Sequence, residues 1–208
     1  SFPPEARHYQ VTVNAADPFG NGLLLPAGPL REPLRALRAA RAVVATHATE
    51  AATRLALLGR LRRLAPRALL ATAAHDVGGL EALPAGAFGR TGSGARPRDW
   101  LRGRRVYALA AIGFPEGFAS ALRRAGARPV GQRFARDHHV FAPEELRAAA
   151  HEAAGLGCAA VVTTAKDAAR LPARLPAGVP WLSARLNFSV ATGRDDLLRA
   201  LRRHASSR

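Results

Sequence analysis

The sequence predicts an α/β fold in which mainly parallel strands are covered by helices on both faces. Short apolar segments recur at 42–46, 106–112 and 159–163, and segments with helical spacing lie between them. A near-continuous apolar segment such as 106–112 is typical of a parallel strand that is buried on both faces. Strands that alternate with helices in this way predict a parallel sheet, whose ligands gather at the carboxyl ends of its strands.

The composition is that of a globular protein. A chain of 208 residues with 48% hydrophobic content can bury one sizeable core or two small ones. The single cysteine, Cys158, excludes an internal disulfide and fits a reducing compartment. No segment approaches the roughly 18 consecutive apolar residues of a membrane span, and the first residues lack the order of a signal peptide. We therefore expect a soluble or peripheral cytoplasmic protein.

The charge is strongly positive, with 31 basic against 15 acidic residues and a net charge of +16. Lys166 is the only lysine, and the arginines recur along much of the chain. This pattern favours a diffuse positive surface over a nucleic-acid-binding stripe, and no cluster of aromatic and basic residues supports nucleic-acid binding. Such a surface is attracted to anionic membranes or phosphorylated substrates, by about 1 kcal/mol for each suitably placed arginine.

The first half of the chain predicts strands, one helix and two loops. The expected elements are a strand at 9–14, a loop at 17–33, a strand at 42–46, a helix at 49–64 capped by Thr49, and a strand at 67–73. The prolines and glycines of the first loop exclude regular structure and favour a rigid, exposed backbone. Residues 74–104 are rich in Gly, Pro and Arg and predict a long loop anchored by Trp100 and Leu101.

The second half predicts further strand and helix pairs. The expected elements are a strand at 106–112, a helix from 115, a strand at 128–134, a helix from 143, a strand at 159–163, a strand pair at 181–184 and 187–191, and a helix at 195–204. Pro143 suits the first turn of a helix, and the acids that follow it suit the positive end of the helix dipole.

Asp137-His138-His139 places a carboxylate beside two imidazoles, directly after the predicted strand at 128–134. A carboxylate that holds one ring nitrogen of a histidine fixes its tautomer and raises its basicity, which suits proton transfer near neutral pH. The alternative is a pair of half-exposed loop histidines before the helix at Pro143.

Two other segments carry candidate ligand groups. Gly20-Asn21-Gly22 can adopt positive φ and present amides to an anion, and Arg31 offers a planar fork for bidentate phosphate contact. A connecting loop with an ordinary surface arginine is the alternative.

Thr164, Lys166 and Asp167 follow the predicted strand at 159–163, so we expect them to line one crevice with Asp137 and His138. A lysine in a chain that otherwise uses arginine suggests a site where a compact point charge is preferred, although its survival by chance is the alternative.

Four segments, 19–33, 111–118, 137–139 and 163–171, occur in the order seen in tetraacyldisaccharide 4'-kinase, the lipid A 4'-kinase family. The chain resembles only the later part of that family. The family's earlier part holds the P-loop, the strand-end aspartates and a membrane-contacting N-terminal helix, which are not recognisable here. The only glycine-rich candidate, 89–94, lacks Gly-Lys-Ser/Thr. Asn14 and Ala165 also stand where the family tends to show acids.

The resemblance implies a remnant of a P-loop kinase-like domain with a lipid-phosphate loop at 1–48, and a second α/β domain at 49–208. It implies transfer of the ATP γ-phosphate, with Mg²⁺, to the 4'-hydroxyl of tetraacyldisaccharide 1-phosphate on the inner face of the cytoplasmic membrane. His138 or His139, oriented by Asp137, would support the base. Arg31 would hold the anionic lipid head or the transferring phosphate, and Asn21, next to Gly22, would shape the loop.

Without a P-loop we expect a truncated or split member of the family, active only with a separate P-loop half. A second hypothesis is a degenerate domain that binds anionic lipid or sugar phosphate without catalysis.

Overall fold

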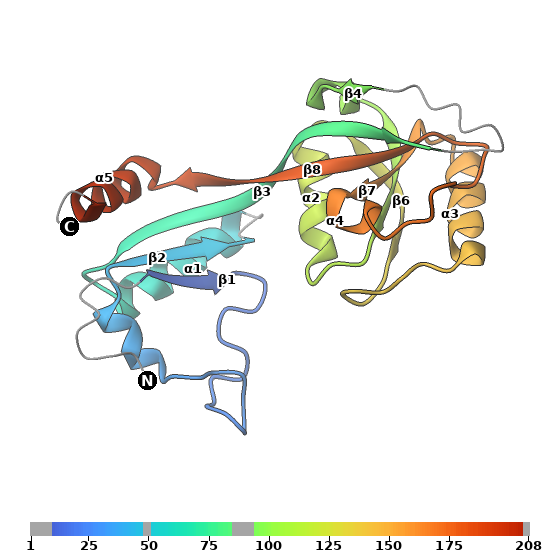
Figure 1. The fold of residues 1–208 in the computed structure, drawn as a ribbon. Helices are drawn as coiled ribbons and strands as arrows, with labels where there is room; N and C mark the ends of the chain where they lie inside the picture. Colours follow the sequence, from blue (N-terminus) through green and yellow to red (C-terminus); the bar gives the residue numbers. More distant parts are fainter. Residues whose placement is uncertain (1–9, 48–50, 85–93, 206–208) are drawn as a thin grey trace. The chain divides into compact units, whose positions relative to one another are not determined.

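The structure is a computed structural model, and it describes residues 10–47, 51–84 and 94–205. The chain forms two compact units. Unit 1 comprises Ser1–Ala74 and Phe188–Arg208, and unit 2 comprises His75–Asn187. Two strands contribute residues to both units, namely β3 (Leu69–Leu83) and β8 (Trp181–Thr192) (Figure 1).

Unit 1 is a small three-layer α/β/α structure. Its elements are β1 (Gln10–Asn14), the 3-10 helix η1 (Leu34–Ala39), β2 (Ala42–Thr46), α1 (Ala51–Leu64), the first part of β3, the end of β8 and α5 (Arg194–Ala205). β1 pairs with β2, and β2 with β3, in parallel.

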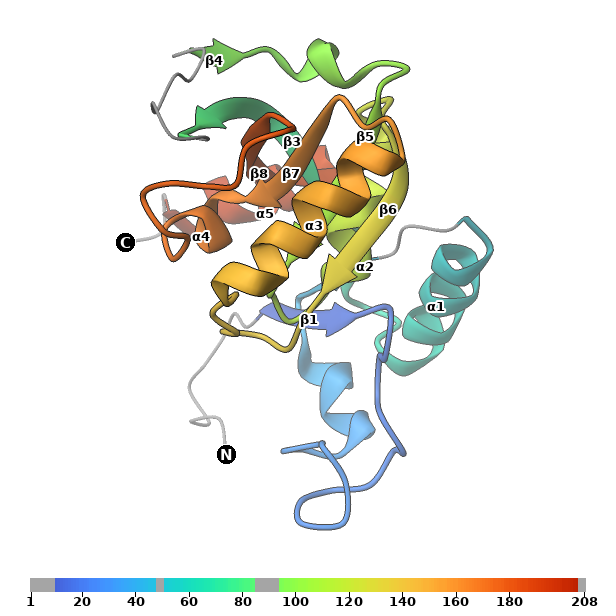
Figure 2. The same cartoon turned by 90° about the vertical axis from the view of Figure 1, so that its right-hand side faces the viewer.

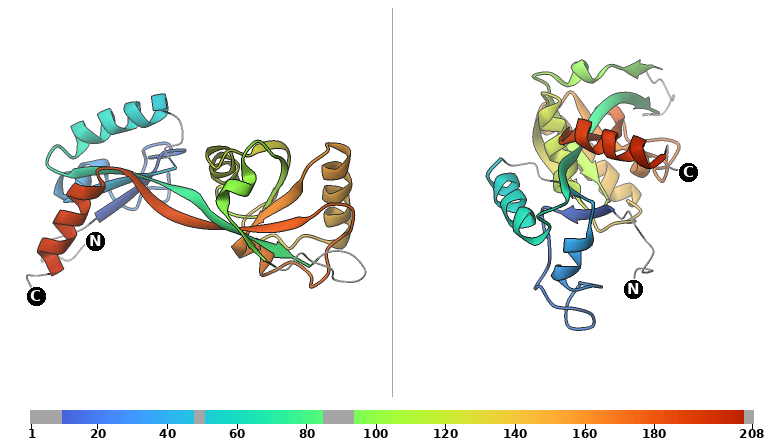
Figure 3. Two further views of the ribbon diagram at one scale, coloured as in Figure 1. Left: turned by 90° about the horizontal axis from the view of Figure 1, so that it is seen from above. Right: turned by 90° about the vertical axis from the view of Figure 1, so that its left-hand side faces the viewer.

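Side chains alternate between the two faces of these strands. Val43 and Ala45 of β2 pack with Leu57 and Leu61 of α1 on one face. The neighbouring residues of β2 pack with Leu197 of α5 on the other face. Figure 3 shows the ribbons of α1 and α5 on opposite sides of these strands. Because successive strand residues point to opposite faces, two helices can cover a single strand layer.

Unit 2 repeats this arrangement around a larger parallel sheet. Its further elements are β4 (Ala95–Arg96), the 3-10 helix η2 (Arg98–Leu101), β5 (Arg105–Ala110), α2 (Pro115–Arg124), β6 (Arg128–Phe134), α3 (Pro143–Gly155), β7 (Ala160–Thr164) and α4 (Ala165–Ala168). The order β8-β7-β5-β6 is parallel throughout.

The central strand β5 is buried on both faces, as its apolar sequence predicts. Val106 and Ala108 pack with Phe118 of α2, whereas Tyr107 and Leu109 belong to the core cluster under α3. Figure 2 shows α3 lying across the face of β5, β6 and β7. The α/β fold with helices on both faces of mostly parallel strands is confirmed.

Residues 74–104 do not form one long loop. The prediction of a long loop there is wrong. β3 continues to Leu83, because Val77 and Leu80 are buried in the core that α2 also covers. β4 then pairs antiparallel with β3. Leu101 is buried and Trp100 packs against the same core, as expected of the anchors.

Three further expectations differ from the structure. The predicted strand pair at 181–184 and 187–191 is one continuous strand, β8, whose sequence lacks a Gly or Pro that would turn the chain. The sequence predicts a domain boundary at residue 48, but the two units divide after Ala74 and before Phe188. Residue 48 is not a boundary because α1 packs into the core of unit 1. The Thr49 cap and most of the 89–94 segment lie outside the described residues.

Candidate functional site

The Asp137-His138-His139 loop follows β6 and is tied to the end of the neighbouring strand β5. The amide of His138 donates to the Ala111 carbonyl oxygen at 3.2 Å. His138 adopts φ +67°, a left-handed conformation that few non-glycine residues occupy. Such a conformation persists only where surrounding contacts hold it, and it is frequent at functional sites. The loop therefore presents the His138 side chain in a defined place, with 72% of it exposed.

Lys166 reaches this loop from the first turn of α4, directly after β7. Its Nζ donates to Asp137 Oδ1 at 3.1 Å. This hydrogen bond is the main reason that the pKa of Asp137 is lowered from its ordinary value, and the nearby His138 contributes in the same direction. Asp137 is thus a carboxylate at neutral pH, flanked by one cation.

Asp167 is the buried centre of the cluster, with 2% of its surface exposed. Its Oδ2 accepts from Thr164 Oγ1 at 2.7 Å and from the Ala111 amide at 3.1 Å. Its Oδ1 accepts from Arg170 Nη2 at 2.6 Å. A buried carboxylate needs such donors to offset its lost hydration. These bonds join the ends of β5 and β7 to α4.

Arg170 contacts both Asp167 and His138 and so connects them. Its Nη1 lies 3.4 Å from His138 Nδ1, and its Nη2 also donates to the Ala111 carbonyl at 3.3 Å. A guanidinium has donors only, so this contact favours the neutral tautomer in which Nδ1 accepts and Nε2 carries the proton. His138 Nε2 is 3.7 Å from Asp137 Oδ2, so that proton faces the carboxylate.

Sequence reasoning missed Arg170. The available signal was the Asp167-x-x-Arg170 spacing, because side chains three residues apart in a helical turn are neighbours. The five residues that were expected to share a crevice lie in one network of hydrogen bonds and ion pairs. Arg170 links its two halves, because it contacts both Asp167 and His138. The five residues are Asp137, His138, Thr164, Lys166 and Asp167.

His139 belongs to another network, although it adjoins His138 in the sequence. Its Nε2 lies 2.9 Å from Glu145 Oε2, which also accepts from the Ala142 amide at 2.8 Å. The Ala142 amide, and then His139, lower the pKa of Glu145. The ring also meets Phe141 edge-on, at 5.1 Å between centroids. His139 therefore secures the first turn of α3, and His138 is the histidine that the structure places beside Asp137.

The loop at 17–33 is organised by Asn21. Its Nδ2 donates to the Ala27 carbonyl at 2.9 Å and its Oδ1 accepts from the Leu23 amide at 3.1 Å. Gly20 and Gly22 have φ of +54° and +77°, as the sequence predicts. Their amides donate to Asp17 Oδ1 and the Phe19 carbonyl. The expectation that these two amides bind an anion is wrong for this structure, because both already donate to acceptors within the loop.

Arg31 is exposed and lines a cavity of about 380 Å³ in unit 1. The wall is mostly apolar and comes from β1, the loop and η1. It comprises Val11, Thr12, Val13, Pro18, Phe19, Leu30, Arg31, Glu32, Pro33, Leu34, Ala36 and Leu37. Arg31 belongs to unit 1 and the Asp137 cluster to unit 2, so the expected cleft that both would share stays a prediction.

Comparisons with known proteins show the family of this chain. The family model described as Tetraacyldisaccharide-1-P 4'-kinase matches residues 7–205. The chain belongs to this family. The four ordered segments that suggested it lie within the matched range.

Curated tetraacyldisaccharide 4'-kinases give the same result. The protein of Anaeromyxobacter dehalogenans strain 2CP-C is 42% identical over 205 residues, covering 92% of this chain and 50% of the relative. That of Methylobacterium radiotolerans is 37% identical over 181 residues, covering 87% and 48%. The chain thus spans about half the length of the curated relatives it matches.

A solved structure with a similar chain trace is the apo form of LpxK from Aquifex aeolicus, in complex with ATP. It is 21% identical, has a TM-score of 0.49, and covers 95% of this chain and 52% of that chain.

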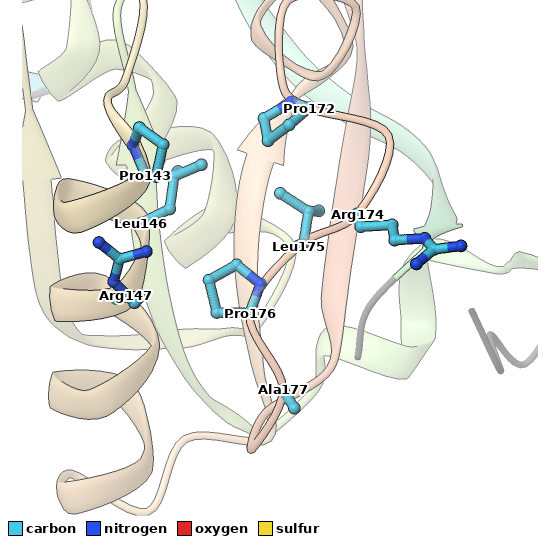
Figure 4. A pocket seen from close by; sticks show the side chains of 8 residues that line it. All are labelled: Pro143, Leu146, Arg147, Pro172, Arg174, Leu175, Pro176 and Ala177. Carbon is cyan, nitrogen blue, oxygen red and sulfur yellow. The ribbon is translucent and has the colours of Figure 1, made fainter. Parts of the chain in front are cut away.

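A second cavity lies between the start of α3 and the segment at 172–177. Its volume is about 370 Å³. Figure 4 shows Leu146 and Leu175 facing each other across it, while Arg147 and Arg174 lie on opposite sides. Among the described residues that line it, none carries a carboxylate or an imidazole.

Among residues 10–47, 51–84 and 94–205, no group of three or more His, Cys, Asp or Glu side chains could hold a metal ion. In the same described ranges no helix is both long and apolar enough to span a bilayer.

Proposed function

We propose that this chain supplies the acceptor-side chemistry of a lipid A 4'-kinase, which transfers the ATP γ-phosphoryl group to the 4'-hydroxyl of tetraacyldisaccharide 1-phosphate. The observation that carries the proposal is the cluster at the carboxyl ends of β5, β6 and β7, in a chain that belongs to this family. A carboxylate, an imidazole and two cations within hydrogen-bonding reach suit phosphoryl transfer, in which the protein positions groups and offsets charge.

His138 is proposed to accept the proton of the attacking hydroxyl at Nδ1. Asp137 Oδ2 lies 3.7 Å from Nε2, and this separation is proposed to shorten to a hydrogen bond when substrate binds. As the proton passes to Nδ1, the hydroxyl oxygen bonds to the γ-phosphorus and the bond from that phosphorus to the ADP oxygen breaks. Ground-state proton acceptance requires Arg170 to release Nδ1, and its long 3.4 Å contact makes this release easy.

Arg170 and Lys166 are proposed to meet the transferred phosphoryl group. Arg170 Nη1 then exchanges the imidazole for a phosphate oxygen, a charge-assisted bond of greater strength. Asp167 keeps the guanidinium in place during this exchange, because its 2.6 Å bond to Nη2 is separate from Nη1.

ATP and Mg²⁺ are proposed cofactors, held by a P-loop whose sequence pattern is not recognisable in this chain. In P-loop kinases the phosphates are cradled by a Gly-x-x-x-x-Gly-Lys-Ser/Thr loop. The one lysine of this sequence, Lys166, follows Ala165 and lies in a different kind of site. We propose that turnover depends on a P-loop segment in addition to the residues described here.

The proposed place of action is the inner face of the cytoplasmic membrane, where the lipid disaccharide phosphate is presented. The net charge of +16 supports attraction to an anionic leaflet. Arg31, exposed beside an apolar cavity, is the proposed contact for the anionic head of the lipid.

The test is the turnover of His138→Ala in a full-length protein that contains these residues together with a P-loop. We expect kcat to fall by about 10²-fold or more, as for loss of a general base, with little change in the KM for the lipid. His151→Ala, an exposed histidine on α3, is the matched control and is expected to keep normal turnover. An unchanged kcat in His138→Ala would refute the assigned role.

The dependence on a P-loop is tested with the 208-residue chain alone, mixed with ATP, Mg²⁺ and the lipid acceptor. Turnover by this chain would refute that dependence. If the full-length protein binds the lipid phosphate but never transfers phosphate, the alternative of a binding domain without catalysis is supported instead.

A further inference from the structure

Three consecutive leucines are exposed at the tip of the loop between β1 and η1. Leu23, Leu24 and Leu25 have 52%, 44% and 61% of their surface exposed. Single exposed leucines are common, but contiguous apolar groups on a surface mark contacts with another molecule. Three adjacent exposed leucines therefore indicate a surface that contacts another molecule.

Most of the backbone polar groups at this tip are already satisfied within the loop. The amide of Leu25 donates to the Leu30 carbonyl at 2.9 Å, and the Leu30 amide donates to the Leu23 carbonyl at 3.2 Å. The Leu24 carbonyl accepts from the Gly28 amide at 3.0 Å. A peptide group that enters an apolar layer without a hydrogen bond costs several kcal/mol. A tip bonded in this way meets the main requirement for entering lipid.

The loop is also held firmly at its base. Asn21 bonds to Leu23 and Ala27, and a β-carbon at Gly28 would lie 2.2 Å from Asn21 Oδ1, so the turn is closely packed. Phe19 is buried in the core of unit 1, and Arg60 of α1 lies 4.5 Å above its ring. The leucines are thus presented by a built turn and not by a loose chain.

Positive charge follows the tip directly. Arg31, Arg35 and Arg38 are exposed in the next segment, against Asp17 and Glu32 as the acids between residues 15 and 41. An apolar tip followed by arginines complements an anionic bilayer, where apolar groups enter the acyl boundary and basic groups meet the head groups.

We propose that the loop tip Leu23–Pro26 inserts into the head-group and acyl boundary of an anionic membrane, with Arg31, Arg35 and Arg38 at head-group level. This placement sets the cavity that Arg31 lines next to lipids still in the bilayer. The identity of the lipid substrate rests on the proposed function, whereas the membrane contact itself does not.

The first experiment measures binding of the full-length protein to vesicles of equal parts phosphatidylcholine and phosphatidylglycerol. Leu25→Asp is expected to weaken binding about tenfold, which corresponds to about 1.4 kcal/mol. Leu55→Asp is the matched control, because Leu55 is a leucine of the same unit, on α1, with 68% exposure. Its binding is expected to stay within a small factor of the parent protein. Equal losses in the two variants would overturn the proposal.

A second measurement locates the tip in the bilayer. Leu25→Trp is expected to gain fluorescence that is quenched by brominated acyl chains, whereas the added signal of Leu55→Trp is not quenched. Absence of quenching in Leu25→Trp would overturn the insertion. So would a finding that Leu25→Asp changes the oligomeric state and leaves vesicle binding intact, since a second copy would then be the partner of the leucines.

The failure of this proposal is distinguishable from failure of the kinase assignment. Turnover of a detergent-dispersed lipid acceptor should be unchanged in Leu25→Asp, because the tip lies outside the His138 cluster. Loss of that turnover together with loss of vesicle binding would indicate a damaged fold and would overturn the proposal.

Discussion

The two loops that the sequence singles out, 17–33 in unit 1 and 135–142 in unit 2, both follow a parallel strand but are built in opposite ways. The first turns its polar backbone groups inward and leaves Leu23–Leu25 outside. The second sets His138 and Asp137 outside, above the buried Asp167. The difference teaches that a loop held by a buried charge can expose polar groups, whereas a loop that satisfies its own backbone can expose apolar side chains.

The largest expected effect concerns the buried centre of the second loop. Asp167→Asn should lower the free energy of unfolding by about 2 kcal/mol, because it leaves the partly buried Arg170 guanidinium without its anion and takes a charged acceptor from Thr164 and Ala111. The measurement is denaturant unfolding at neutral pH.

The control for this prediction is Asp99→Asn. Asp99 and Arg102 form an ion pair with the same i,i+3 spacing, but both side chains are about 70% exposed. We expect a change within about 0.5 kcal/mol. Similar losses in the two variants would show that Asp167 does not organise the cluster.

An intermediate effect concerns the packing of the first loop. Gly28→Ala should destabilise the turn by about 1–2 kcal/mol, since its β-carbon would collide with Asn21 Oδ1 and the Leu23 carbonyl. Limited proteolysis within the loop, together with denaturant unfolding, measures this effect.

Gly59→Ala should change the stability of the protein in the opposite direction to Gly28→Ala. A β-carbon there meets nothing within 4 Å, and Gly59 lies inside α1, so the change should stabilise the protein by roughly 0.5–1 kcal/mol. A Gly28→Ala protein with unchanged proteolysis would contradict the packed turn.

The smallest effect concerns the exposed pair of Lys166 and Asp137. The pKa of Asp137 is lowered in the folded protein, so the pair stabilises the fold above the ordinary carboxyl pKa, and this stability is lost as pH falls through the lowered value. Lys166→Gln should raise the Asp137 pKa toward its ordinary value, as followed by carbon-13 NMR of the carboxyl group. An unmoved titration would show that His138, and not Lys166, controls Asp137.

Much of the fold and part of the site could be predicted from the sequence. The convergence of Asp137, His138 and Lys166 follows from the rule that parallel strands end at one edge of the sheet. The same rule could not separate His138 from His139. That distinction depends on Glu145 in α3, whose side chain captures His139.

The errors have local physical reasons. The second half of β3 contains His75, Asp76 and the pair Gly78-Gly79, which resemble a loop in sequence. At Gly78 a β-carbon would lie 2.3 Å from the side chain of Asn187 in β8, so any larger residue there would displace that side chain. Strand pairing between distant segments thus decided the structure, and no local pattern reports it.

The tautomer of His138 tests the account most directly, because it combines the Asp167–Arg170 bond, the contact from Arg170 to Nδ1 and the position of Asp137 in one observable. Long-range proton–nitrogen NMR of the imidazole, at a pH where the ring is neutral, reads it out. The account predicts the proton on Nε2 and a bare Nδ1, with the preference lost in Arg170→Leu. A proton on Nδ1 in the parent protein would contradict it.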